Sequence, residues 1–350
     1  MNVKPLKIGE LIAKIPVIQG GMGVGVSLSN LAGTVAKEGG IGIISTAQIG
    51  FKTPGFDKNP IETNLKEIKT QIDKAREIAE GGIVGVNIMV ASLQYSEYVK
   101  AAVAAGADLI ISGAGLPVDL PKWTMGTRTK AVPIVSSAKS AEVICKYWLK
   151  KYNFLPDMVV IEGPKAGGHL GFTHEDLMNL DTLDYDSEIV KIIDCVNSYG
   201  SRLQKEIPVV VAGGIYTRED MEHYLSMGAS GVQMATRFVT TFECDAPLDY
   251  KETYIHAKKE DIVIVKSPVG MPGRAIHNSF IEKTKEGKVP HGKCHSCVST
   301  CSPGETPYCI TQALVNAVTG NTENALLFCG TNAYRAQKLE TVHDIMQEFS

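Results

Sequence analysis

Short apolar runs alternate with longer amphipathic stretches along the first 235 residues of the chain. Each run is rich in Val and Ile and nearly continuous, as expected for a parallel strand that is buried on both faces. The pattern predicts eight strands, at about 16–20, 41–45, 84–89, 108–113, 132–136, 158–162, 207–212 and 231–235. Eight strands separated by helical stretches predict an α/β protein with a (β/α)8 TIM barrel.

The stretches between these runs have the period of amphipathic helices. They predict helices at 28–39, 61–80, 94–105, 139–152, 186–205 and 217–227. Several of them end in glycine, which often closes a helix in the left-handed conformation. The segment 116–129 contains two prolines and a weak period, so we expect only a short or irregular helix there.

The pattern changes after a last helix that we expect between residues 247 and 259. Residues 260–310 contain many helix-breaking residues and the cysteines, which favours an irregular segment: Pro268, Gly270, Pro272, Gly273, Pro290, Pro303 and Pro307. Helical period returns at 308–319 and 332–348. The sequence therefore predicts a barrel, 1–259, and a Cys-containing C-terminal extension or lid, 260–350, that packs on the barrel.

Composition narrows the class of protein. Hydrophobic residues make up 44% of the chain and charged residues 21%, which is enough apolar material for a large core. The formal net charge of −3 gives no basic surplus for binding nucleic acid. No signal peptide and no run of ~20 apolar residues is visible, so we expect a cytoplasmic protein with no membrane segment.

The predicted strands end in glycine-rich loops, which would meet at one face of a barrel. These loops are Gln19–Gly23, Ser112–Gly115, Gly163–Gly171 and Ala212–Gly214. Barrel active sites form at that face, and glycine lets the backbone approach a ligand closely. His169 lies in the third loop, where an imidazole with a pKa near ~6.5 can exchange a proton at neutral pH. A histidine that only hydrogen-bonds the loop is the alternative.

The loops after the seventh and eighth strands favour a phosphorylated cofactor. In barrel enzymes this is the recurrent place where backbone N–H groups hold a phosphate. The chain has neither a Rossmann glycine motif in the right context nor a Walker A motif.

Five motifs, in this order along the chain, resemble one family. They are Pro16–Met22 (PVIQGGM), Ala166–Gly171 (AGGHLG), Ala212–Ile215 (AGGI), Gly228–Phe238 (GASGVQMATRF) and Gly270–Asn278 (GMPGRAIHN). Together they are similar to the nitronate monooxygenases, formerly called 2-nitropropane dioxygenases, and to the related flavin-dependent enoyl-acyl-carrier-protein reductases. Inosinate dehydrogenases and phosphate-binding isomerases would share the AGG and GVQMATR loops but would not explain AGGHLG.

The resemblance implies a non-covalent FMN on the barrel, with His169 as the catalytic base or acid. It implies flavin contacts from Gly21, Met22, Gly23, Asn87, Glu162, Gly167, Gly168, Ala212, Gly213 and Gly214, and a phosphate cradle from Gln233, Met234, Ala235 and Thr236. Two positions depart from the family pattern. Ala235 replaces a glycine of the phosphate motif, and Glu162 stands where nitronate enzymes often carry Gln and enoyl reductases often carry Glu.

The resemblance favours an FMN-dependent nitronate monooxygenase that oxidises alkyl nitronates or nitroalkanes with O2. The alternatives are an NAD(P)H-dependent enoyl-acyl-carrier-protein reductase, with NAD(P)H as co-substrate, and a non-catalytic flavin or metal-binding protein. We expect a small-molecule substrate, a nitronate or an enoyl thioester. The sequence leaves open whether the protein forms a homodimer.

Four cysteines are crowded into sixteen residues: Cys294, Cys297, Cys301 and Cys309. The spacing C-x2-C-x3-C-x7-C, with His291 shortly before it and His295 within it, is compatible with an iron–sulfur cluster or a tetrahedral zinc ion. Free thiols in a lid are the alternative. We expect this cluster to lie outside the flavin site.

Overall fold

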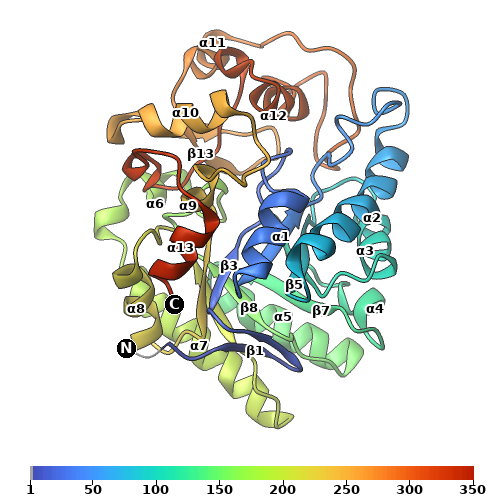
Figure 1. The fold of residues 1–350 in the computed structure, drawn as a ribbon, viewed down its shortest axis with the longest axis vertical. Helices are drawn as coiled ribbons and strands as arrows, with labels where there is room; N and C mark the ends of the chain where they lie inside the picture. Colours follow the sequence, from blue (N-terminus) through green and yellow to red (C-terminus); the bar gives the residue numbers. More distant parts are fainter. Residues whose placement is uncertain (1–2) are drawn as a thin grey trace.

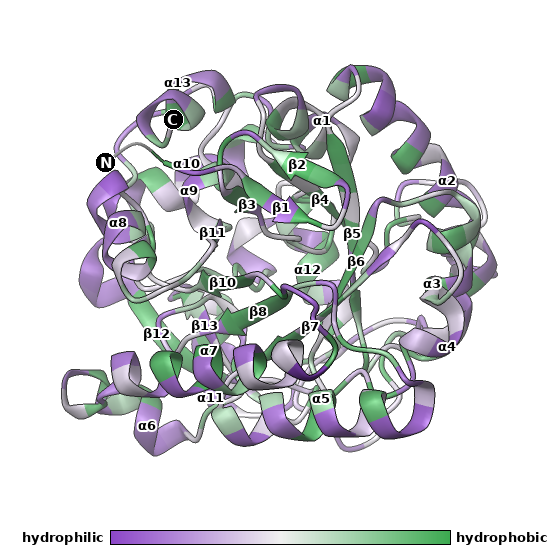
Figure 2. Cartoon of the chain, turned by 90° about the horizontal axis from the view of Figure 1, so that it is seen from below, coloured by the Kyte–Doolittle hydropathy of each residue, from purple (hydrophilic) through white to green (hydrophobic). Residues whose placement is uncertain are grey.

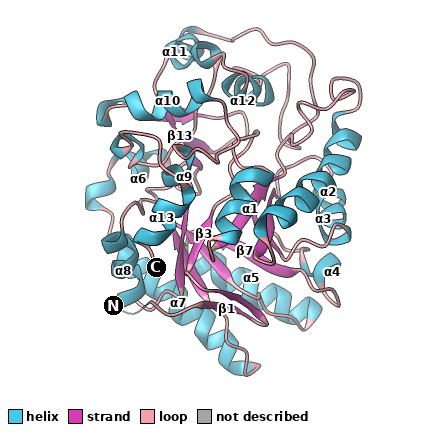
Figure 3. Ribbon diagram, in the orientation of Figure 1, coloured by secondary structure: helices cyan, strands magenta, loops and turns pink. Residues whose placement is uncertain are grey.

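A closed barrel of eight parallel strands forms the centre of the computed structural model, which describes residues 3–350. Figure 3 shows the strands surrounded by helices. The barrel strands are β3 (Val17–Gln19), β4 (Ile41–Ser45), β5 (Ile83–Met89), β6 (Leu109–Gly113), β7 (Lys130–Val135), β8 (Val159–Glu162), β10 (Val209–Ala212) and β11 (Gly231–Met234). Val232 of β11 pairs with Val17 of β3 and closes the ring. The predicted strands and barrel are confirmed.

An outer layer of helices covers the barrel. Its members are α1 (Ser29–Lys37), α2 (Pro60–Ala79), α3 (Tyr95–Ala104), α4 (Pro121–Thr124), α5 (Ala138–Tyr152), α7 (Tyr185–Arg202) and α8 (Arg218–Ser226). The predicted helices are found within a few residues, and α4 is the short helix expected between 116 and 129. The Thr217 hydroxyl accepts a hydrogen bond from the Asp220 backbone N–H, which fixes the start of α8 after β10.

A short hairpin closes the lower end of the barrel, which Figure 2 views from below. It consists of β1 (Leu6–Ile8) and β2 (Leu11–Ala13), with Gly9 in the left-handed region at φ +60° in the turn. Leu6, Ile8 and Ala13 join the apolar side chains of the barrel interior. The sequence analysis missed this hairpin because strands of three residues give too short an alternation to detect.

The extension lies over the carboxyl ends of the barrel strands, at the top of Figure 1. There β12 (Ile262–Lys266) and β13 (Pro272–Ile276) form an antiparallel pair, and β13 also pairs with β9 (Gly168–His169) from the barrel. Two helices follow, α11 (Ser279–Glu286) and α12 (Ile310–Val318). The expectation of an irregular segment over 260–310 is therefore wrong for residues 262–286. The prolines there lie at the start of a strand or outside it, where they interrupt no ladder.

The end of the chain returns to the barrel wall. Val342, Ile345, Met346 and Phe349, on and just after α13 (Val342–Glu348), are fully buried together with Val17 and Val35. The last helix of the predicted extension thus packs on the barrel through its apolar face, and the boundary at residue 259 stays a prediction. The predicted helix 332–348 is helical only in its second half, after the short 3-10 segment η4 (Ala333–Arg335).

The remaining elements are short connections. They are α6 (His174–Met178), α9 (Thr236–Val239), α10 (Leu248–His256), and the 3-10 segments η1 (Leu180–Thr182), η2 (Lys259–Asp261) and η3 (Thr322–Asn324). Within residues 3–350, no helix has the length and apolar character needed to cross a membrane.

Candidate active site

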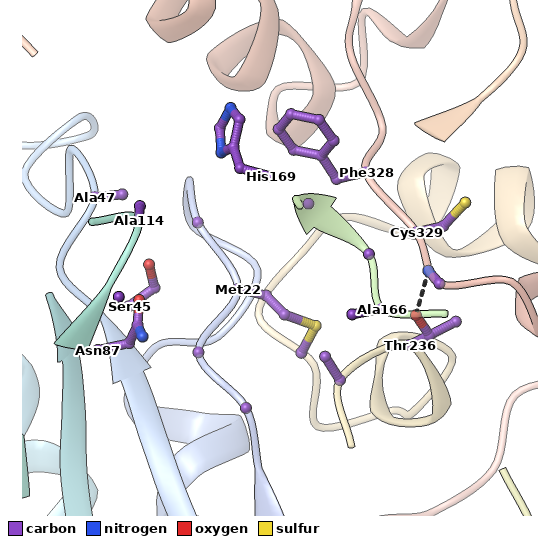
Figure 4. Close-up of a pocket in the computed structure, with 18 of the residues that line it drawn as sticks. Met22, Ser45, Ala47, Asn87, Ala114, Ala166, His169, Thr236, Phe328 and Cys329 are labelled. Carbon is purple, nitrogen blue, oxygen red and sulfur yellow. Dashed lines mark hydrogen bonds between the residues drawn. The ribbon is translucent and has the colours of Figure 1, made fainter. Parts of the chain in front are cut away.

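A deep cavity lies between the carboxyl ends of the strands and the extension. Its volume is about 240 Å³, close to the lower end of the ~300–1,000 Å³ range of ordinary ligand pockets. His169 and all fourteen residues expected to contact the cofactor line it. Figure 4 shows Met22 between Asn87 and Ser45 on one side and Ala166 and Thr236 on the other, with His169 and Phe328 beyond them. Residues distant in sequence therefore meet in one place.

His169 is held between the barrel and the extension. Its backbone pairs with Gly273 on β13, its ring packs edge-on against Phe328 at 4.9 Å, and its Nε2 lies 2.7 Å from Ser267 Oγ. Ser267 is buried and also accepts a hydrogen bond from the Val269 backbone N–H. Burial lowers the pKa of His169 to about 4, because the charged imidazolium loses its hydration. The imidazole is therefore neutral near pH 7 and able to accept a proton.

Glu162 is the second titratable group that faces the cavity. It ends β8, where its backbone carbonyl accepts a hydrogen bond from the Tyr185 hydroxyl. Burial raises the pKa of its carboxyl to about 7, because the carboxylate has no compensating charge nearby. The cavity thus combines a neutral base with a carboxyl that changes charge near neutral pH.

Backbone packing fixes the loops on the phosphate side of the cavity. Gly213 has φ +104°, and a Cβ there would lie 2.9 Å from the Ala166 nitrogen. The Thr236 hydroxyl accepts a hydrogen bond of 2.8 Å from the Gly330 N–H, and the Asn332 side chain donates one of 2.6 Å to the Gly214 carbonyl. The extension therefore holds the same loops that the family motifs identify.

The sequence analysis missed most of the residues that the extension contributes to the cavity. These are Val269, Val298, Ile310, Thr311, Leu314, Phe328, Cys329, Gly330 and Asn332, with Tyr250 and Tyr254 from α10. The apolar run Ala325–Cys329 followed by glycine was a visible signal of a buried segment. Nothing in the local pattern showed that it would reach the mouth of the barrel.

The metal site expected at the four clustered cysteines stays a prediction. Among residues 3–350, no group of three or more His, Cys, Asp or Glu side chains is arranged to hold a metal ion. Hydrogen bonds from Leu93 N–H to the Cys297 carbonyl and from Ser299 N–H to the Ala91 carbonyl dock this loop on the β5–α3 connection. In this arrangement Cys294 is exposed, whereas Cys297 lines the cavity.

Cys297 also corrects the expectation that the whole cluster lies outside the site. Its thiol hydrogen-bonds the Thr311 side chain, and burial raises its pKa, so it stays protonated at neutral pH. With the buried Cys329, the extension wall of the cavity therefore has two neutral thiols.

A parallel barrel with glycine-rich loops, a neutral histidine and a buried carboxyl at its mouth defines an enzyme of the barrel oxidoreductase class. A model of the family described as nitronate monooxygenase matches residues 4–350. The chain belongs to the nitronate monooxygenase family, whose members are FMN-dependent oxidoreductases.

Two curated relatives illustrate the range of the similarity. A probable nitronate monooxygenase of Staphylococcus saprophyticus is 27% identical over 307 residues, which cover 82% of each chain. The (3aS,4S,5R,7aS)-5-hydroxy-7a-methyl-1-oxo-octahydro-1H-indene-4-carboxyl-CoA dehydrogenase of Mycobacterium tuberculosis is 25% identical over 282 residues, 79% of this chain and 67% of the relative.

Solved structures share the fold. FabK from Thermotoga maritima superposes with a TM-score of 0.71 at 24% identity, covering 96% of this chain and 92% of its own. A nitroalkane oxidase from Streptomyces ansochromogenes gives a TM-score of 0.72 at 18% identity, covering 96% and 94%. At these identities the likeness establishes the barrel and its extension, and leaves the substrate undecided.

The residues of the cavity fit the FMN that the family uses. The buried Gln233 side-chain oxygen has no hydrogen-bond partner among the described residues, so a donor from a ligand would satisfy it. Gly213 and Gly214 both have positive φ, and side chains there would collide with the 163–166 loop. A backbone surface of this kind can approach a phosphate closely.

Proposed function

We propose that the protein is an FMN-dependent nitronate monooxygenase that oxidises alkyl nitronates and nitroalkanes with O2. The observation that carries the proposal is the neutral His169 at the mouth of the barrel, in a cavity lined by every residue that the resemblance assigns to flavin contacts. Bound FMN would supply the electron transfer. Gly21, Met22, Glu162 and Gly214 would contact it, and Gln233 and Thr236 would hold its phosphate end.

His169 would act as the base that removes the α-proton of a neutral nitroalkane. Its Nε2 faces Ser267, whereas Nδ1 has no hydrogen-bond partner within residues 3–350. With Nε2–H donating to the Ser267 hydroxyl, Nδ1 keeps a free lone pair for the substrate proton. Ser267 is then a positioning residue that selects the basic tautomer.

Reduction of an enoyl thioester by NAD(P)H is the second candidate, and Glu162 favours it. Enoyl reductases of this family often carry Glu at the position where nitronate enzymes carry Gln. The raised pKa of Glu162 gives the cavity a proton donor near pH 7, and an acid is what the α-carbon of the product needs.

His169→Ala tests the role of the base. The variant should retain bound flavin and lose turnover of neutral nitroethane by about 100-fold or more, while preformed ethyl nitronate, which needs no deprotonation, stays within about threefold of wild type. Oxygen uptake with the two substrates measures both rates. Equal losses on the two substrates, or no loss on nitroethane, would contradict the assignment.

Anaerobic bleaching of the flavin absorbance separates the two candidate functions. Loss of the flavin bands on addition of ethyl nitronate, without a response to NADH or NADPH, supports the monooxygenase. Rapid bleaching by a reduced nicotinamide, followed by recovery on addition of an enoyl thioester, supports the reductase. A protein that binds no flavin would refute both, and a flavin that no substrate changes would leave the non-catalytic binder.

A further inference from the structure

Arg274 is an arginine in the protein interior without a counter-charge. It lies on β13 opposite Gly168, and only 2% of its surface is exposed. Its Nη1 donates to the Ala166 carbonyl, whereas the buried Nη2 has no hydrogen-bond partner. Within residues 3–350, no carboxylate forms an ion pair with it.

Arg237 is a second buried arginine of this chain and offers a comparison. It is 6% exposed, and it pairs with both Glu340 and Glu348. A buried charge without a partner strongly destabilises a fold, so an isolated guanidinium is expected where a ligand supplies the negative charge. Burial lowers the pKa of Arg274 to about 10, which leaves it charged at neutral pH.

The position of Arg274 indicates which part of a bound ligand its charge would act on. Its side chain lies behind Ala166, and its backbone carbonyl accepts a hydrogen bond from Cys329 N–H. Ala166 packs against Gly213, and Cys329 is followed by Gly330, whose N–H donates to Thr236. Arg274 thus lies behind the Ala166 and Cys329 part of the cavity wall, which adjoins the loops that the resemblance assigns to the phosphate.

We propose that Arg274 is a positioning residue that makes this chain selective for the phosphorylated flavin. Its charge stabilises the phosphate of FMN through the Ala166 and Cys329 backbone, and its hydrogen bond holds the Ala166–His169 loop in place. The inference rests on the proposed binding of FMN. It predicts that the charge of Arg274 sets the preference for FMN over riboflavin, which lacks the phosphate.

The test compares the two flavins on the deflavinated chain by fluorescence titration. Arg274→Met should weaken FMN binding by about 10- to 100-fold and riboflavin binding by less than about threefold. Arg274→Gln is a second neutral variant that keeps an N–H donor for Ala166, and Arg274→Lys should retain most of the FMN preference. Arg202→Met, which removes an exposed arginine on α7, controls for net charge and should change neither affinity.

The outcomes separate the charge from a structural role. Equal loss of FMN and riboflavin binding in the neutral variants would show that Arg274 only holds the loop, and unchanged binding of both would remove it from the site. Either result overturns the inference while the proposed function stands. A wild-type chain that binds neither flavin refutes the proposed function and the inference together.

Discussion

Glu162→Gln should remove a pH dependence that the wild-type enzyme shows near neutrality. Because burial raises the pKa of Glu162 to about 7, the carboxyl is mostly neutral at pH 6 and mostly ionised at pH 8. A nitronate is an anion, so it meets a neutral Glu162 carboxyl at the lower pH and a carboxylate at the higher one. The glutamine variant keeps the shape of the side chain and never ionises.

The size of the effect follows from Coulomb's law. Two like charges about 7 Å apart repel by about 2 kcal/mol at an effective dielectric constant of about 20, which corresponds to about 30-fold in affinity. The open mouth of the cavity lets water screen part of this, so we expect about a tenfold fall in kcat/KM for ethyl nitronate between pH 6 and pH 8.5. His169 does not contribute in this range, because its pKa of about 4 lies well below it.

The assay is initial-rate oxygen uptake with freshly ionised ethyl nitronate, measured across this pH range for both proteins. The wild-type profile should fall through pH 7 and the Glu162→Gln profile should be flat, with its plateau near the wild-type value at pH 6. If the variant shows the same fall as the wild type, Glu162 is not the group that titrates and the electrostatic reasoning is refuted.

Two further substitutions test the geometry of the site. Gly21→Ala places a Cβ about 2.5 Å from the Asn87 Cβ, so the first glycine loop must shift. Its FMN affinity, measured by fluorescence titration, should fall about tenfold or more. Gly292→Ala, where a Cβ would meet nothing within 4 Å, is the matched control. Ser267→Ala leaves His169 without its tautomer-selecting partner, so turnover of neutral nitroethane should fall about tenfold while ethyl nitronate turnover is retained. A parallel loss on both substrates would assign Ser267 a purely structural role.

The barrel could be predicted from the sequence because its signals are local. Each strand is buried on both faces and therefore appears as an apolar run, and most of the helices between the strands carry an amphipathic period. The β12–β13 hairpin, in contrast, could not be predicted from its local sequence pattern. Its prolines and glycines resemble loop residues, and only the long-range pairing of Gly273 with His169 makes them part of a sheet.

The candidate site also has a part that the sequence predicted and a part that it did not. The glycine loops were identified by family motifs, and the barrel fold brings them together. The contributions of Phe328 and Cys297 depend on how the extension folds back over the mouth, which no spacing encodes. The spacing of the cysteines likewise did not show that Cys297 would line the cavity.

The return of α13 to the barrel wall has a consequence for protein engineering. The cover of the cavity is an internal cassette, bounded by α10 before it and α13 after it, and both of these helices bury side chains in the same apolar cluster as β3. Exchanging substrate preference between relatives therefore calls for replacing about residues 262–331 as an insert, with the native tail kept in place. A chimera joined at residue 259 would carry a foreign last helix against α1, and would lose barrel stability before its new cover could act.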